Sequence, residues 1–198
     1  MKSEIKKLLD SFAEISDERK LLLDSFSEII NNDLRENSEA KLTFICTHNS
    51  RRSHMAQVFA ELAAEHFGIT GIMTYSGGTE ATEVYSSAIE TFKEFGLNVK
   101  LVEDGENPHY TLEVSDKKVE LFSKEYGHDS NPQSGFTAIM VCSHADANCP
   151  IVLGAKNRVS LPYEDPKDFD GTPEEKEKYM ERFLEIGREM LYTFSKIS

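Results

Sequence analysis

The sequence is short of cysteines and of basic residues, and each shortage excludes a class of protein. Three of its 198 residues are cysteine, which fits a catalytic role in a reducing compartment better than a disulfide framework. Lysine and arginine number 22 against 35 acidic residues, for a net charge of −13. This balance argues against nucleic acid or an anionic membrane surface as a partner. Because there is also no membrane-length apolar run and no signal peptide, we expect a cytoplasmic protein.

The apolar content is high enough for a proper core, at 39% of residues with twelve Phe and seven Tyr. The length suggests one domain of about 155 residues and an appendage. We expect residues 1–40 to form an N-terminal helical hairpin extension, with a dimerisation element as the alternative, and residues 41–198 to form the main domain. Two stripes with helical spacing predict the hairpin: Ile5, Leu8, Leu9, Phe12 and Ile15, then Leu22, Leu23, Phe26, Ile29 and Ile30.

The most informative segment lies between an apolar strand candidate at 42–45 and a helix candidate that opens near Arg52. It reads Cys46-Thr47-His48-Asn49-Ser50-Arg51-Arg52-Ser53. Backbone N–H groups of a tight loop and of a helix start bind anions. An arginine six positions after the cysteine can grip two oxygens through its planar fork, and the same positive field lowers the pKa of the Cys46 thiol. The segment therefore predicts an oxyanion-binding loop with a thiolate nucleophile.

The Cys-x5-Arg-Ser pattern resembles the low-molecular-weight protein tyrosine phosphatases and the thioredoxin-coupled arsenate reductases that share their fold. Three further stretches extend the resemblance. Residues 75–79 look like the second strand and its Ser-Ala-Gly-Thr turn, with Gly77 in place of the alanine, and 95–97 look like a helix end and the following strand. Residues 164–166 resemble the loop whose aspartate, here Asp165, is the general acid.

We therefore expect a three-layer α/β/α sandwich with a central parallel sheet and with the oxyanion loop at the carboxyl edge of the first strand. The strands are predicted near 42–46, 72–76, 136–142 and 157–161. A long closing helix is predicted from the apolar face of Tyr179, Phe183, Ile186, Met190 and Phe194. The segment 98–135 is expected to add edge strands beside the parallel sheet, near 97–102, 110–114 and 122–126.

Cys142 and Cys149 follow the strand candidate at 136–141 and favour the reductase branch, since a simple phosphatase needs Cys46 alone. The resemblance implies a relay for arsenic detoxification. Cys46 attacks arsenate and Asp165 protonates the departing hydroxide; Cys142 then attacks Cys46, which releases arsenite. Cys149 attacks Cys142, and the resulting disulfide is reduced by thioredoxin or a similar thiol donor. Because disulfide-linked Cα atoms lie about 5.5 Å apart, whereas seven extended residues span about 23 Å, the segment 142–149 must loop or form a short helix.

Two alternatives stay open. One is a phosphatase that hydrolyses phosphomonoesters through a phosphocysteine intermediate, with Cys142 and Cys149 left to packing. In the residues that follow Asp165 and Pro166, Phe169 is the single aromatic. It offers little ring surface on which a phosphotyrosine ring could stack. The other alternative is an oxyanion-binding module with an inactive site, favoured if His48, where the family usually carries glycine, distorts the loop.

No metal and no cofactor is expected. Paired Cys-x2-Cys spacings typical of zinc sites are absent, and Gln57 stands where some reductases carry a glutamate of a potassium site. Within the loop, Ser53 is expected to donate to the Cys46 thiolate and Asn49 to fix the backbone by hydrogen bonds. Arg51 is expected to point outward.

Overall fold

A central parallel sheet organises the protein, whose computed structural model describes residues 1–149 and 151–197. Its strands are β1 (Ala40–Cys46), β2 (Ile72–Gly78), β6 (Phe136–Met140) and β7 (Ala155–Ser160), in the order β2-β1-β6-β7. All neighbouring pairs are parallel. The predicted sheet is confirmed. Strand β1 is buried along nearly its whole length, which explains why its sequence is almost continuously apolar.

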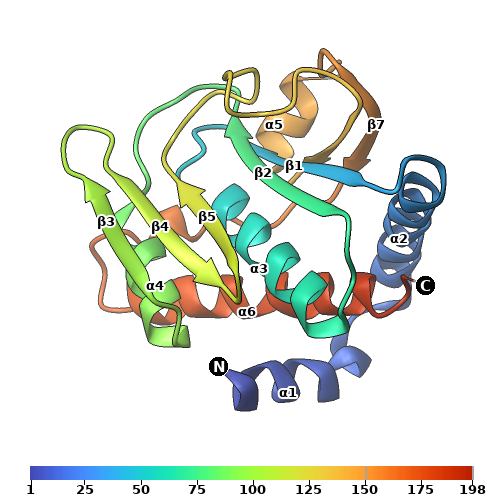
Figure 1. The fold of residues 1–198 in the computed structure, drawn as a ribbon. Helices are drawn as coiled ribbons and strands as arrows, with labels where there is room; N and C mark the ends of the chain where they lie inside the picture. Colours follow the sequence, from blue (N-terminus) through green and yellow to red (C-terminus); the bar gives the residue numbers. More distant parts are fainter. Residues whose placement is uncertain (150, 198) are drawn as a thin grey trace.

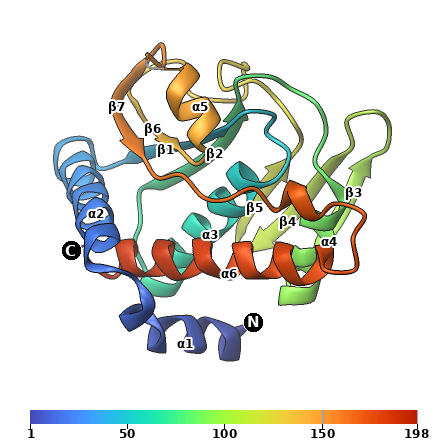
Figure 2. The ribbon, with the colours of Figure 1, turned by 180° about the vertical axis from the view of Figure 1, so that it is seen from behind.

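Helices cover both faces of this sheet, which confirms the predicted α/β/α architecture. In both views, α3 (Arg52–Phe67) and α6 (Glu175–Phe194) lie on one side of the sheet, and α5 (Ser143–Asn148) lies on the other (Figures 1 and 2). A Cβ atom on Gly187 of α6 would lie 2.2 Å from the Phe59 ring of α3. Glycine is therefore needed at this position for α3 and α6 to pack at their observed distance.

The closing helix α6 carries the predicted apolar face into the core. Phe183 lies at its centre, with its ring 4.4 Å from that of Phe59 and 5.2 Å from that of Phe92 on α4 (Ser86–Phe95). The five residues predicted for this face are all buried: Tyr179, Phe183, Ile186, Met190 and Phe194.

The first forty residues form the two predicted helices, α1 (Lys2–Asp10) and α2 (Asp17–Asn37), joined by a short 3₁₀ turn at Phe12–Glu14. Ser16 begins α2 by accepting a hydrogen bond from the Arg19 N–H at 3.2 Å. Both helices pack against α6, with α1 lying along it (Figure 2). The division of the chain at residue 40 into an extension and a domain stays a prediction.

The segment 98–135 does not extend the parallel sheet, so the prediction of edge strands there is wrong. It forms a separate antiparallel sheet from β3 (Val99–Glu103), β4 (His109–Val114) and β5 (Lys117–Leu121). The last strand lies earlier than predicted because a two-residue turn at 115–116 returns the chain, with Ser115 left-handed at φ 51°. The backbone of the segment meets β2 at an isolated bridge between Gly78 and Glu125.

Among the described residues, no helix combines the length and the apolar content that a membrane span requires. The 3₁₀ turn η2 (Pro166–Phe169) lies between Asp165 and Asp170.

Candidate active site

Cys46 ends β1 at the carboxyl edge of the sheet, and α3 begins at Arg52, where the sequence predicts a helix start. The Cys46 Sγ atom is nearly buried and lies 3.1 Å from Ser53 Oγ. Ser53 Oγ already accepts a hydrogen bond from Asn49 Nδ2 at 2.8 Å, so the hydroxyl hydrogen is free to point at the sulfur. The Ser53 hydroxyl is therefore placed to donate to the Cys46 sulfur.

Asn49 holds the loop in shape through its backbone and its side chain. Its φ of 46° is left-handed, a conformation that asparagine tolerates better than most residues. Its Oδ1 accepts from the Lys124 N–H at 2.9 Å, and its carbonyl lies 2.8 Å from His54 Nε2. The left-handed residue of the loop is therefore Asn49 and not His48, and the backbone strain considered for His48 does not arise.

His54 supports Asn49 as a neutral ring. Burial lowers the pKa of His54 to about 3, with the Lys124 charge adding to the effect. Because the Asn49 carbonyl can only accept, the single ring proton lies on Nε2, and Nδ1 accepts from Ser76 Oγ at 3.1 Å. The ring thus connects β2 to the oxyanion loop through α3.

The turn after β2 braces the loop from the other side. Thr79 N–H donates to the Cys46 carbonyl at 3.1 Å, and Glu80 N–H donates to the Thr47 carbonyl at 2.9 Å. A Cβ on Gly78 would lie 2.2 Å from the Glu80 carbonyl oxygen and 2.6 Å from that of Thr47. Glycine at 78 therefore permits the close approach of the turn to the loop.

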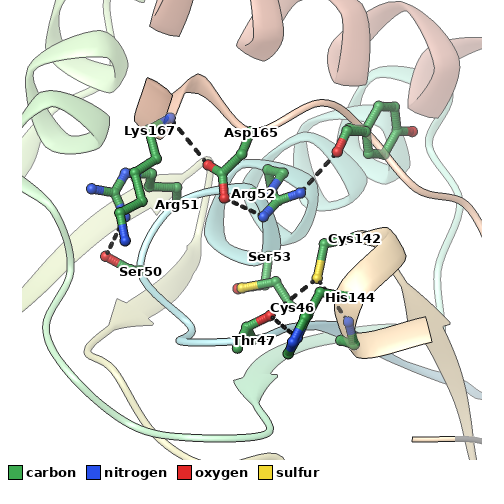
Figure 3. A network of polar contacts seen from close by, with 12 residues as sticks. Cys46, Thr47, Ser50, Arg51, Arg52, Ser53, Cys142, His144, Asp165 and Lys167 are labelled. Carbon is green, nitrogen blue, oxygen red and sulfur yellow. Dashed lines mark hydrogen bonds and ion pairs between the residues drawn. The ribbon is translucent and has the colours of Figure 1, made fainter. Parts of the chain in front are cut away.

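The predicted anion-binding arginine and the predicted acid come together at the mouth of the loop (Figure 3). Arg52 Nη2 forms an ion pair with Asp165, and Arg52 Nη1 donates to the Tyr163 carbonyl at 2.8 Å. The other Asp165 oxygen accepts from the Lys167 N–H at 3.2 Å and thereby caps η2. The acid candidate is thus held directly against the group that would grip an oxyanion.

Cys142 also reaches the loop, and Cys149 lies at the opposite end of the same helix. Cys142 is fully buried, caps the start of α5 by accepting from the Ala145 N–H at 3.3 Å, and lies 3.5 Å from Thr47 Oγ1 (Figure 3). Thr47 Oγ1 is in turn 3.3 Å from His144 Nδ1. Cys149, at the helix end, is half-buried and donates to the Ile151 carbonyl at 3.4 Å.

Arg51 does not point outward as predicted. Its side chain is buried, with 9% of the residue exposed. Nε donates to Tyr179 Oη at 2.5 Å, Nη2 forms an ion pair with Asp170 at 2.5 Å, and the guanidinium lies 4.1 Å from the centre of the Tyr85 ring. The reason is the long closing helix and the loop before it, which cover the outer side of the oxyanion loop with groups that match an arginine.

The family model for low molecular weight phosphotyrosine protein phosphatases matches residues 41–109. An arsenate reductase of Staphylococcus epidermidis is 30% identical over 124 residues, covering 62% of this chain and 76% of that protein. The chain belongs to the low-molecular-weight protein tyrosine phosphatase family. Another relative in this family, an arsenate reductase of Halalkalibacterium halodurans, is 29% identical over 146 residues, covering 73% of this chain and 88% of its own.

Solved structures of the phosphatase family share the fold. A low-molecular-weight protein tyrosine phosphatase from T. tengcongensis superposes with a TM-score of 0.54 at 19% identity, covering 80% of this chain and all of that one. An arsenate reductase in the phosphate-binding state gives 0.51 at 20% identity, covering 80% of this chain and 99% of its own. At such identities the likeness shows the family fold alone.

Several supporting residues of this family member were not predicted from its sequence. The sequence analysis assigns neither His54 nor Lys124 to the loop, although Lys124 lies in the segment 98–135 that it expects beside the sheet. Asp170 and Tyr179 carry no sequence signal for a partner of Arg51, because an aspartate in a loop and a tyrosine on an apolar helix face are ordinary in any protein. Only the folded chain brings them to the loop.

The sulfur atoms of Cys46 and Cys142 lie next to groups that can donate hydrogen bonds. Cys46 lies against Ser53, and Cys142 lies against the Ala145 N–H and Thr47. Among the residues for which the structure gives coordinates, no group of three His, Cys, Asp or Glu side chains is arranged to hold a metal ion.

Proposed function

We propose that this protein is an arsenate reductase in which Cys46, Cys142 and Cys149 act in turn as a disulfide relay. The observation that carries the proposal is the contact between Cys142 and Thr47, the residue next to Cys46, with Cys149 at the far end of α5. Hydrolysis of a phosphomonoester through a phosphocysteine intermediate does not require a second thiol at the oxyanion loop. The arsenate reductases among its relatives support the same substrate class, a small oxyanion.

The first step uses the loop and the acid. The Cys46 thiolate attacks arsenic, while Arg52 and the loop N–H groups hold the arsenate oxygens. An arsenic–oxygen bond breaks, and the oxygen leaves as water after Asp165 supplies a proton. The Arg52 fork must exchange Asp165 for substrate oxygens, because one guanidinium edge binds one anionic partner in full.

The second step transfers two electrons. The Cys142 thiolate attacks the Cys46 sulfur, the sulfur–arsenic bond breaks, and its electron pair stays on arsenic, which leaves as arsenite. Cys142 is oriented for this step by the hydrogen bond from the Ala145 N–H and by the Thr47 hydroxyl at 3.5 Å.

The third step requires α5 to unwind. Seven helical residues separate Cα atoms by about 10 Å, whereas a disulfide requires about 5.5 Å. Cys149 therefore reaches Cys142 only after the helix between them rearranges. Its thiolate then attacks the Cys142 sulfur, the disulfide between Cys46 and Cys142 breaks, and Cys46 leaves as a thiolate. The disulfide between Cys142 and Cys149 is then reduced by thioredoxin or a similar dithiol protein.

The second candidate is a phosphomonoester phosphatase, favoured by the match to the phosphatase family model over residues 41–109. Cys46, Arg52 and Asp165 suffice for a phosphocysteine intermediate and its hydrolysis. The two activities share the loop and differ in their need for Cys142 and Cys149. A thiol substitution therefore separates them.

The deciding experiment measures arsenate-dependent NADPH oxidation with thioredoxin and thioredoxin reductase. We expect turnover in the wild type, background in Cys149→Ser, and an unchanged rate in Ala147→Ser, which alters an exposed position of the same helix. Hydrolysis of p-nitrophenyl phosphate, where present, should persist in Cys149→Ser. A wild type that hydrolyses the ester but shows no arsenate-dependent turnover would establish the phosphatase instead.

A further inference from the structure

Arg51 belongs to the oxyanion loop, but its guanidinium is held mainly by groups outside that loop. It contacts Tyr179 Oη at 2.5 Å, Asp170 at 2.5 Å and the face of Tyr85 at 4.1 Å, and it donates to the neighbouring Ser50 Oγ at 3.4 Å. Tyr179 Oη itself donates to the second Asp170 oxygen at 2.6 Å. The Asp170 carboxylate is thus held by the oxyanion loop and by α6 at the same time.

Asp170 lies at one end of the segment that carries the proposed acid, Asp165. Asp165 and Asp170 lie on either side of η2 (Pro166–Phe169), so the short segment that carries the proposed acid is anchored at both ends. The neighbouring arginines 51 and 52 each hold one of these aspartates. The two anchors differ in one respect: Arg52 must release Asp165 to bind an oxyanion, whereas no substrate competes for the buried Arg51.

We propose that Arg51 is a positioning residue which, with Tyr179 and Asp170, keeps the acid segment 165–170 docked over the oxyanion loop while Arg52 exchanges Asp165 for substrate. The inference rests on the proposed role of Asp165 as the acid of this site. It applies equally to arsenate reduction and to phosphomonoester hydrolysis, since both need a proton at the departing oxygen.

The chemistry of the cluster explains why the residue is an arginine. A planar guanidinium can stack on the Tyr85 ring while its edges donate to a hydroxyl and a carboxylate, and a lysine ammonium cannot meet all three with the same geometry. Burial and the Asp170 hydrogen bond raise the pKa of Tyr179, so its hydroxyl stays a donor at neutral pH. The Tyr179 hydroxyl can therefore accept from Arg51 while it donates to Asp170.

Hydrogen exchange of the whole protein tests the docking without relying on activity. We expect Arg51→Met to speed amide exchange across 165–171 at least about tenfold, with Arg51→Lys in between. Arg188→Met is the matched control, because it removes another partly buried ion pair of α6, to Glu14, on the side of α1. Unchanged exchange at 165–171 in Arg51→Met, or equal loosening in Arg188→Met, would overturn the proposal.

Kinetics then separates positioning from a general loss of structure. p-Nitrophenolate leaves more readily without a proton than phenolate does. A displaced acid should therefore slow the hydrolysis of phenyl phosphate more than that of p-nitrophenyl phosphate. We expect kcat of Arg51→Met to fall at least about ten times more with phenyl phosphate than with p-nitrophenyl phosphate, with KM little changed. For arsenate the expected effect is likewise on kcat.

Equal losses for the two esters would assign Arg51 a merely structural role and overturn the proposal. A wild type that turns over neither ester nor arsenate would refute the proposed function. In that case the exchange at 165–171 alone decides whether Arg51 docks the segment.

Discussion

Asn49 shows how much of the site depends on a single residue. Its left-handed backbone, at φ 46°, turns the chain between Cys46 and Arg52. Neutral His54 and the Lys124 N–H each occupy one of its oxygens. A residue that could not adopt this conformation, or a charged ring at 54, would open the loop.

Lys124 gives a prediction at the residue scale. Its side chain is buried, with only a 3.4 Å bond to the Phe122 carbonyl and the Phe122 ring at 4.2 Å from its ammonium. Burial lowers the pKa of Lys124 from 10.5 to about 8. The folded state therefore binds fewer protons than the unfolded state between these values, and the stability contributed by this residue rises with pH across that window.

We expect the free energy of unfolding of the wild type, relative to Lys124→Met, to increase by about 3 kcal/mol between pH 8 and pH 10.5. Below pH 8 the full cost of burying the charge is present, so the variant has its greatest relative stability there. Urea unfolding at several pH values measures the difference, and the exposed Lys118→Met serves as control. A difference that stays constant with pH would contradict the prediction.

At the scale of elements, α5 is held firmly against the sheet, although the proposed relay requires this helix to unwind. Arg158 on β7 donates to the carbonyls of Asp146 and Cys149, at 2.7 and 3.3 Å, and forms an ion pair with the Asp146 carboxylate at 2.6 Å. Ser160 donates to the same carboxylate at 2.7 Å. These contacts fasten the helix to the sheet, and unwinding must break them.

Arg158→Met should therefore speed formation of the disulfide between Cys142 and Cys149. We expect a rise of about five- to tenfold, as for the loss of a charged hydrogen bond worth about 1–1.5 kcal/mol. The rate is measured with diamide in a Cys46→Ser background, so that only these two thiols react. Lys156→Met is the control, since Lys156 lies on the same strand and pairs with Asp33 instead. Equal rates in the two variants would show that Arg158 does not restrain α5.

At the scale of the whole molecule, α6 is the helix that joins the separate parts, because the N-terminal helices and α3 pack against it from different sides. Leu23, Phe26 and Ile30 of α2 are completely buried. Arg19 of α2 forms a largely buried ion pair with Glu189 of α6 at 2.9 Å and also donates to the Pro162 carbonyl, just before the acid segment. The first forty residues are thus part of the same packed structure as the site.

Phe26→Ala should lower the free energy of unfolding of the entire protein by about 3–5 kcal/mol, since the cavity it leaves is fully enclosed. The exposed Leu21→Ala on the same helix should cost less than about 0.5 kcal/mol. Urea unfolding followed by circular dichroism gives both values. If the two variants are equally stable, α2 is a dispensable appendage.

The local parts of this structure were predictable because they depend on neighbours in the chain. The strand, loop and helix around Cys46 follow from an apolar run, a polar turn and a helical period within about 25 residues. The closing helix follows from the spacing of its apolar face. The antiparallel sheet was misplaced because its register depends on a turn at Ser115-Asp116, which lacks the glycine that marks most two-residue hairpins.

The sequence alone is enough to predict the order of the main strands and helices, the candidate nucleophile and arginine of the loop, and the spacing of Cys142 and Cys149. The folded structure is needed to show which groups far apart in the chain meet. Arg51 pairs with Asp170 and Tyr179, 119 and 128 positions away, and Asn49 accepts from the Lys124 backbone 75 positions away. Such pairings leave no periodicity or motif in the chain, because they arise from the way α6 and the 122–126 segment pack around the loop. The physical reason is that a charge finds its partner by position in space, and packing of the core sets that position.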